Sequence, residues 1–280
     1  MKKIYKYIIN ILLFSISLLL IIYSSYRIIK VINNRNTLDN NIIEIDSTIV
    51  DKNNNDKLVF TNGYLILKDD IKDDEFNVSV RSSMLERIVE VYQYKETKED
   101  DETYSYEMNW FSELIDSSNF KNSEYKNPSN IKYKSKTYYN DTYLGAFKLN
   151  NKEINELGCN SRYLDLNSEF ASKNGFKISN QYYTTSEDID LPEIGDIRIS
   201  FKYNSSSSVS ILALQNNNTF DDYKLNDMLI HKVYDEKLTK KDIIKDIYPL
   251  KIVLYIIIIV VSLLLCSILI IVNKKSIREK

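Results

Sequence analysis

Several residue types are scarce in this chain of 280 residues, which has one histidine, two cysteines, five glycines and three prolines. The single histidine, His231, excludes metal sites and proton relays that need two or more histidines. Cys266 lies in an apolar run and Cys159 lies outside it, so no disulfide within the chain is expected. We expect Cys159 to be a small apolar core residue; pairing with a second chain is the alternative. So few glycines do not favour a loop-rich sandwich, and the sheet topology stays open.

Recognisable catalytic motifs are absent as well. The sequence contains no nucleophile elbow, dinucleotide loop, phosphate loop or zinc-protease motif. Carboxylates are plentiful, but catalysis by paired carboxylates has no spacing that would identify it. We therefore assign no catalytic, cofactor-binding or metal-binding residue and do not expect an enzyme.

The most apolar segment is Ile252–Val272, in which isoleucine, leucine or valine fills 17 of 21 positions. As a helix it would be about 31 Å long, which matches the hydrocarbon thickness of a bilayer. No charged residue opposes its insertion. The segment predicts a transmembrane helix.

A second apolar run, Ile8–Tyr23, follows a basic start. Its 16 residues could belong to a signal peptide, but no small-x-small cleavage site follows it. Tyrosines flank both of its ends, where interfacial aromatics belong. We therefore expect an uncleaved anchor. A helix of about 24 Å is shorter than the hydrocarbon layer, so flanking residues must extend it or the bilayer must be locally thin.

Basic residues cluster at both ends of the chain, and the positive-inside rule places both termini in the cytoplasm. Without the seven basic residues and one glutamate of these ends, residues 7–273 hold 30 basic and 38 acidic residues, a formal charge of −8. This acidic balance argues against nucleic acid as a partner. Neither apolar run holds a charged residue, which argues against ion or proton transport through the helices.

The segment between the runs predicts mainly strands. Tyr104, Tyr106, Met108 and Trp110 alternate with polar residues, which is typical of a half-buried strand with these four side chains inward. Arg87–Glu96 is rich in strand-forming residues, and the charged link 97–102 suits a hairpin. Residues 31–56, rich in asparagine, have no clear pattern.

A second hairpin is predicted further along the chain. Ile197–Tyr203 alternates, and residues 204–208 would turn the chain into Val209–Leu214. Two short helices are also expected. Asn150–Leu157 has an asparagine cap and ends at Gly158, and Thr239–Asp242 resembles a capping box. The latter leads into an apolar stripe of Ile243, Ile244, Ile247 and Leu250. We interpret it as a stalk helix that packs on the domain or lies at the membrane interface, and the chain then enters the span after Pro249.

These elements predict an α+β, sheet-dominated extracytoplasmic domain between two transmembrane α-helices. We divide the chain into an N-terminal anchor with its flanks (1–30), an extracytoplasmic domain (31–248) and a C-terminal transmembrane helix with a basic cytoplasmic tail (249–280).

Six stretches in the middle of the chain resemble the transmembrane protein 43 (LUMA) family. Tyr104-Ser105-Tyr106 followed by Trp110-Phe111-Ser112-Glu113 is similar to that family's Tyr-Ser-Tyr…Trp-x-Ser-Glu. The other five stretches, in the same order as in the family, are Val91–Glu96, Ser118–Phe120, Lys126–Ser129, Gly145–Phe147 and Pro192–Phe201. Six short matches in order are specific, although each alone is weak.

The resemblance implies an integral membrane protein with a large domain outside the cytosol. Animal members self-associate and organise envelope proteins in the endoplasmic reticulum and inner nuclear membrane, and no catalytic or cofactor residues come with the family. Family members have several apolar segments near the C-terminus, where this chain has one span. The lysine-led start and compact length resemble a bacterial member, which would reside in the cell membrane.

We expect a membrane scaffold or assembly protein whose extracytoplasmic domain self-associates or binds other membrane proteins. Its partners would be the lipid bilayer, other copies of itself and other membrane proteins. Few small residues line either span, so the domain is expected to carry most of the assembly energy. Two alternatives stay open: a two-span oligomeric channel or chain-length regulator, and a carboxylate enzyme acting outside the cytoplasm.

The predicted topology can be tested with protease added to sealed vesicles or intact cells. Because the basic ends place both termini in the cytoplasm, tags on either terminus should stay protected while the domain is cut. Cleavage of either tag in a sealed preparation would contradict this orientation.

Overall fold

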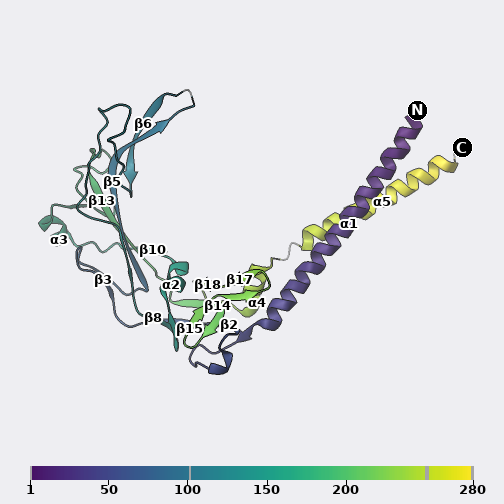
Figure 1. Ribbon diagram of the computed structural model, residues 1–280, viewed down its shortest axis with the longest axis horizontal. Helices are drawn as coiled ribbons and strands as arrows, with labels where there is room; N and C mark the ends of the chain where they lie inside the picture. The colour runs from purple at the N-terminus through teal and green to yellow at the C-terminus, as the bar shows by residue number, and fades with distance from the viewer. Residues whose placement is uncertain (1, 101, 250–251, 279–280) are drawn as a thin grey trace.

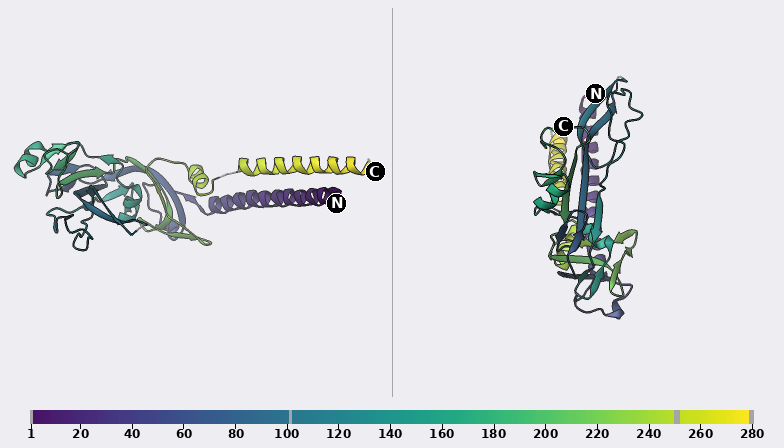
Figure 2. Two further views of the ribbon diagram at one scale, coloured as in Figure 1. Left: turned by 90° about the horizontal axis from the view of Figure 1, so that it is seen from above. Right: turned by 90° about the vertical axis from the view of Figure 1, so that its left-hand side faces the viewer.

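Two long helices flank a sheet-rich domain in the computed structural model, which describes residues 2–100, 102–249 and 252–278. The helices are α1 (Lys2–Asn41) and α5 (Ile252–Arg278). Figures 1 and 2 show them side by side, with both ends of the chain at the same end of the molecule. This arrangement confirms the predicted fold class, a sheet-dominated α+β domain between two apolar helices.

α1 and α5 contact each other, and the side chains buried between them are small. On α1 the buried residues Ser17 and Ser24 are seven positions apart, and on α5 Ser262 is buried. Small residues let two helices approach closely in lipid, where no hydrophobic drive brings them together. The sequence has few small residues in either span, but Ser17, Ser24 and Ser262 are buried between the helices. Most large apolar side chains of the two helices point outward.

The first helix does not end where its apolar run ends. It continues past residue 30 to Asn41, through the segment that had no clear sequence pattern. Leu38, in its last turn but one, is fully buried in the domain. It packs with Leu58, Phe60, Leu212, Ile230 and Ile243. The transmembrane helix is therefore also a core element of the domain.

The first of two large sheets lies next to this helix end and has the order β15-β14-β2-β8-β9, with β1 added beside β2 and β18 beside β14. Its strands are β1 (Ile43–Glu44), β2 (Leu58–Leu67), β8 (Thr142–Leu144), β9 (Phe147–Leu149), β14 (Ser208–Asn216), β15 (Thr219–Asp221) and β18 (Lys232–Tyr234).

Both faces of this sheet are covered. Val59 and Ile211 point into a core shared with the helix α2 (Asn151–Leu157), while Phe60 and Leu212 point toward α1 and the helix α4 (Lys240–Ile247). A strand covered on both sides needs apolar residues at successive positions, which explains the nearly continuous apolar run in β14.

The second sheet has the order β11-β12-β13-β5-β6, with β10 beside β13 and β7 beside β5, and Figure 1 shows it extending away from the helices. Its strands are β5 (Met84–Lys98), β6 (Tyr104–Phe111), β7 (Lys136–Tyr139), β10 (Ser161–Arg162), β11 (Lys177–Ser179), β12 (Tyr182–Thr184) and β13 (Ile197–Tyr203). The remaining elements are the ribbons β3 (Ile71–Asp73) with β4 (Val78–Val80) and β16 (Tyr223–Leu225) with β17 (Met228–Ile230), the helix α3 (Ser168–Lys173) and the 3-10 turn η1 (Lys52–Asn54).

Several local predictions are confirmed. β5 and β6 form the predicted hairpin, with Val91 opposite Phe111 and Lys98 opposite Tyr104. Both short helices form: the capping box predicted at Thr239 is present, and the predicted asparagine cap at Asn150 is also part of a capping box. α4 packs on the domain through Ile243 and Ile244, as expected of the stalk helix. Leu250, the last residue of the predicted stripe, lies outside the described residues.

The predicted second hairpin is wrong. β13 pairs with β5 in the second sheet, whereas β14 pairs with β2 in the first. Residues 204–208 carry the chain from one sheet to the other instead of reversing it. Asn204 holds this crossing, because its buried side chain donates to the carbonyl of Gly158 at 2.7 Å.

The predicted buried face of β6 is wrong at Met108, whose side chain is 53% exposed. Tyr104, Tyr106 and Trp110 are half-buried. β6 is the edge strand of its sheet, and no element covers Met108. Alternation therefore shows that these four side chains share one face, but not whether that face lies against the core. Truncation of Trp110 should cost less than it would at a fully buried site.

The burial of Leu38 generates a stability prediction. Leu38→Ala should lower the free energy of unfolding by about 2–5 kcal/mol, because it opens a cavity where α1 enters the core. The matched control is Leu191→Ala, since Leu191 is 77% exposed and its truncation should change stability by less than about 0.5 kcal/mol. Thermal or denaturant unfolding of the full chain in detergent would measure both. Equal effects would contradict the anchoring role of α1.

Candidate functional site

The second sheet has one buried face and one partly open face. Val89, Ile199 and Tyr183 point into an aromatic-rich core around Phe76. On the opposite face the register brings Glu90 beside Arg198 and Tyr92 beside Trp110, and these four side chains are only half-buried. Because neighbouring residues in a strand point to opposite faces, the apolar core positions force these polar and aromatic residues outward.

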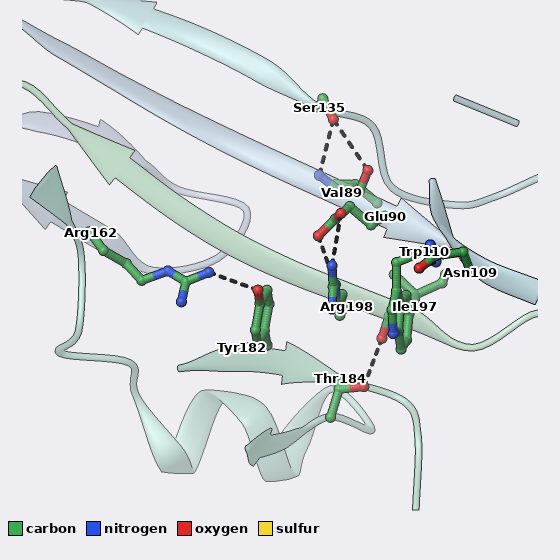
Figure 3. A network of polar contacts seen from close by, with 10 residues as sticks. All are labelled: Val89, Glu90, Asn109, Trp110, Ser135, Arg162, Tyr182, Thr184, Ile197 and Arg198. Carbon is green, nitrogen blue, oxygen red and sulfur yellow. Dashed lines mark hydrogen bonds and ion pairs between the residues drawn. The ribbon is translucent and has the colours of Figure 1, made fainter. Parts of the chain in front are cut away.

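Arg198 lies at the centre of this open face (Figure 3). Its Nε is 2.7 Å from Oε2 of Glu90, and its Nη2 is 2.9 Å from Oε1. The same guanidinium carbon is 4.7 Å from the ring centroid of Trp110 and 4.8 Å from that of Tyr182. A planar guanidinium suits this arrangement, because it binds a carboxylate with two parallel hydrogen bonds and packs flat on aromatic rings.

Further side chains extend the stack in both directions. Arg162 lies 4.7 Å from the Tyr182 ring centroid and donates to its hydroxyl at 2.8 Å. Tyr92 packs on Trp110 with a centroid distance of 5.4 Å. We call this set the aromatic–arginine strip; it consists of Glu90, Tyr92, Trp110, Arg162, Tyr182 and Arg198.

Around the strip, side chains complete the sheet's hydrogen bonding. β7 and β6 pair with the same edge of β5 but leave a gap between them, and there the Ser135 hydroxyl accepts from the Val89 N–H at 3.0 Å. On the other side, Thr184 donates to the Ile197 carbonyl at 3.0 Å. These contacts, visible in Figure 3, hold the strands under the strip in fixed register.

Residues 112–130, the strap, wrap the far end of the β5–β6 hairpin. The Asn127 side chain accepts from the Tyr94 N–H and donates to the Tyr94 carbonyl, both at 2.8 Å, in the way an added strand would pair. Buried Gln93 donates to the Glu113 carbonyl at 2.6 Å and accepts from the Ile115 N–H at 2.9 Å. Two amide side chains therefore attach the strap to β5.

Aromatic stacking attaches the strap to β6. The Tyr125 ring stacks on Tyr106 with a centroid distance of 4.0 Å and an interplanar angle of 15°. The Tyr106 hydroxyl donates to Glu96 at 2.5 Å, and Glu96 also accepts from the backbone of Lys121. Partial desolvation and the hydrogen bond to Glu96 raise the pKa of Tyr106, so it remains a hydrogen-bond donor at neutral pH.

His231 lies in a different place, beside α2. Its Nε2 is 2.9 Å from Glu153 and its Nδ1 is 3.4 Å from Asp222, with the histidine and Glu153 side chains both buried. Glu153 also accepts from the Asn150 N–H and so completes the α2 capping box. This role is structural, since His231 joins the ribbon β16–β17 to the start of α2.

Within the described part of the chain, no group of three or more histidine, cysteine, aspartate or glutamate side chains is arranged to hold a metal ion. Cys159 packs at the margin of the core, and burial raises the pKa of its thiol to about 11. A thiol with so high a pKa is a poor nucleophile at neutral pH.

Most of the stretches that resemble a known family converge on this part of the fold. They supply β5, β6, the strap and β13. Gly145 lies elsewhere, in the turn between β8 and β9, with a φ of 60°, and a side chain there would come within 2.2 Å of the Ser47 carbonyl oxygen. This turn therefore requires glycine for a steric reason.

Comparison with known sequences supports the same conclusion. The sequence model described as transmembrane protein 43 matches residues 86–279. The chain belongs to the transmembrane protein 43 family. Together with the two apolar helices, family membership indicates an integral membrane protein.

Curated members of the transmembrane protein 43 family are moderately similar to this chain. The Drosophila melanogaster homolog is 26% identical over 163 residues, which cover 52% of this chain and 43% of the relative. The Homo sapiens protein is 30% identical over 163 residues (54% and 40%), and the Mus musculus protein is 30% identical over 168 residues (55% and 42%). The matched region thus spans less than half the length of these relatives. No solved structure matches the chain.

No site residue was predicted from the sequence. The sequence pattern alone could have placed only some residues of the aromatic–arginine strip. Arg198 stands at an outward position of a predicted strand, whereas the alternation around Trp110 predicted an inward position. The contact between Arg198 and Glu90, however, joins residues 108 positions apart and depends on the register of β13 against β5. Arg162 and Tyr182 lie on short strands that have no strong pattern of their own.

The stacked arginine generates a second stability prediction. Arg198→Lys should lower the free energy of unfolding by about 1–2 kcal/mol, because lysine cannot keep both hydrogen bonds to Glu90 or lie flat between two rings. It should also shift the emission of Trp110, the single tryptophan of the chain. Arg81→Lys is the control, since Arg81 forms an exposed ion pair with Asp70 and should change stability little. If the two variants behave alike, the stack does not stabilise the sheet.

Proposed function

We propose that this protein is a membrane-anchored scaffold whose central domain self-associates or binds other membrane proteins through the aromatic–arginine strip. The observation that carries the proposal is the composition of the open sheet face. Tryptophan, tyrosine and arginine are the residues most enriched among those that dominate binding energy at protein interfaces. Here Tyr92, Trp110, Tyr182, Arg162 and Arg198 adjoin one another on that face.

The strip is also preorganised. Glu90 and two rings fix the Arg198 guanidinium, and Tyr92 packs on Trp110. Side chains already held in one conformation lose less entropy when a partner binds, so more of the contact energy appears as affinity. A strip that served stability alone would be expected to lie under another layer of the fold, whereas part of each of these side chains is open to solvent.

Its place in the fold is suited to lateral assembly. Figure 1 shows the second sheet projecting away from α1 and α5, so a neighbour anchored in the same membrane can reach it. In the proposed topology both termini are cytoplasmic and the strip lies outside the cytoplasm. The protein would then act by holding its partners, without turning over a substrate.

The test is the oligomeric state of the full chain in detergent, measured by light scattering across micromolar concentrations. We expect an assembly larger than a monomer, and Tyr92→Ala should weaken it about tenfold or more because the variant removes the aromatic ring that packs on Trp110 in the strip. Tyr64→Ala is the matched control, since Tyr64 is 70% exposed but belongs to the first sheet.

The partner-binding branch is tested in native membranes by crosslinking the same two variants. Loss of crosslinked membrane partners with Tyr92→Ala, but not with Tyr64→Ala, would support it. If Tyr92→Ala changes neither the mass of the assembly nor the crosslinked partners while the protein stays folded, the strip is not the binding surface.

A further inference from the structure

A groove of about 790 Å³ lies where the end of α1 meets α4. Arg35 and Asp39 line it from α1, and Lys240, Lys241 and Lys245 line it from α4. Figure 1 shows α4 beside the lower part of α1, between the domain and α5. The groove is therefore bounded by the two segments that lead directly into the membrane spans.

The groove carries positive charge that the protein does not neutralise. Lys240 pairs with Asp39 at 2.7 Å, which balances those two charges. Exposed Lys241 and Lys245, one helical turn apart, form no hydrogen bond or ion pair with the described residues. Hydrogen bonds from Thr239 and, to a lesser extent, the charge of Lys245 lower the pKa of the neighbouring Asp242 carboxyl. Arg35 donates through Nε to the Tyr248 carbonyl at 2.8 Å, while its buried Nη2 has no partner among the described residues. Against these three cations the lining holds one further carboxylate, Glu44.

The position of the groove relative to the bilayer can be derived from the alignment of α1 with α5. Arg27 of α1 lies 5.9 Å from the ring centroid of Tyr255, so these residues are at one height. Since the helices are antiparallel, Ile252, the first residue of the apolar span, is level with about Lys30. Arg35 is then about 7.5 Å beyond the start of the hydrocarbon layer. The headgroup layer is about 5–7 Å thick, so the Arg35 side chain can reach it. Lys240 contacts the Asp39 and Ile42 carbonyls and lies further out, while Lys245 lies one turn along α4 toward Tyr248, which Arg35 contacts.

We propose that this groove binds the phosphate headgroup of an anionic phospholipid from the leaflet on the domain's side of the membrane. Arginine and lysine form charge-assisted hydrogen bonds with phosphate oxygens, and an unpaired guanidinium nitrogen beside two free ammonium groups supplies donors from both helices. The remainder of the chain between the basic ends has a formal charge of −8, so the groove is a local exception and not part of a generally basic surface. A bound headgroup would bridge α1 and α4.

The experiment is native mass spectrometry of the full chain released from detergent containing equal amounts of phosphatidylglycerol and phosphatidylcholine. Wild type should retain phosphatidylglycerol in preference. Lys241→Gln with Lys245→Gln should reduce that preference by roughly tenfold, because each cation near the surface contributes to headgroup binding. The control is Lys224→Gln with Lys232→Gln, which removes the same charge from two exposed lysines outside the groove.

A preference that both double variants lose equally, or that neither loses, would overturn the proposal. A further arm adds excess inorganic phosphate. If phosphate displaces phosphatidylglycerol completely, the groove is a site for free anions and the lipid assignment fails. Retention of the lipid in the presence of phosphate supports a headgroup site, because the acyl chains then contribute to binding.

Discussion

The burial of Leu38 is the contact on which the arrangement of this protein depends. It commits the last turns of a transmembrane helix to the core of the domain, among side chains of β2, β14 and α4. A helix that entered through a flexible linker would leave the domain free to rotate on the membrane. Here the first sheet must instead be apolar on both faces, because α1 and α4 cover one and α2 covers the other. β14 has apolar residues at successive positions because the packing of α1 into the core covers one of its two faces.

The second sheet has the opposite organisation. Only one of its faces is covered, and its polar face is ordered by side chains that bond to one another. β5 is the common element, since its 15 residues pair with β13, β6 and β7 and begin beside the first core at Met84. One long strand therefore connects a fully enclosed half of the domain, next to the end of α1, with a half that displays its residues.

Local sequence signals predicted local structure well and distant pairing poorly. The caps on Asn150 and Thr239 and the β5–β6 hairpin depend on residues close in sequence, and all formed as predicted. Residues 204–208 are turn-forming, but whether they reverse the chain or carry it across depends on partners more than a hundred positions earlier. The same limit applies to the strip, whose central contact requires the register of two distant strands. Met108 shows that alternation groups side chains on one face of a strand but cannot say whether another layer covers that face.

The contact between α1 and α5, in which Ser17, Ser24 and Ser262 are buried, has a mechanical meaning. Two helices that pack against each other tilt together when the bilayer thins or thickens. Because α1 continues into the core without a break, such a tilt would not be absorbed at a joint. It would turn the whole domain, and with it the open sheet face, relative to the membrane plane.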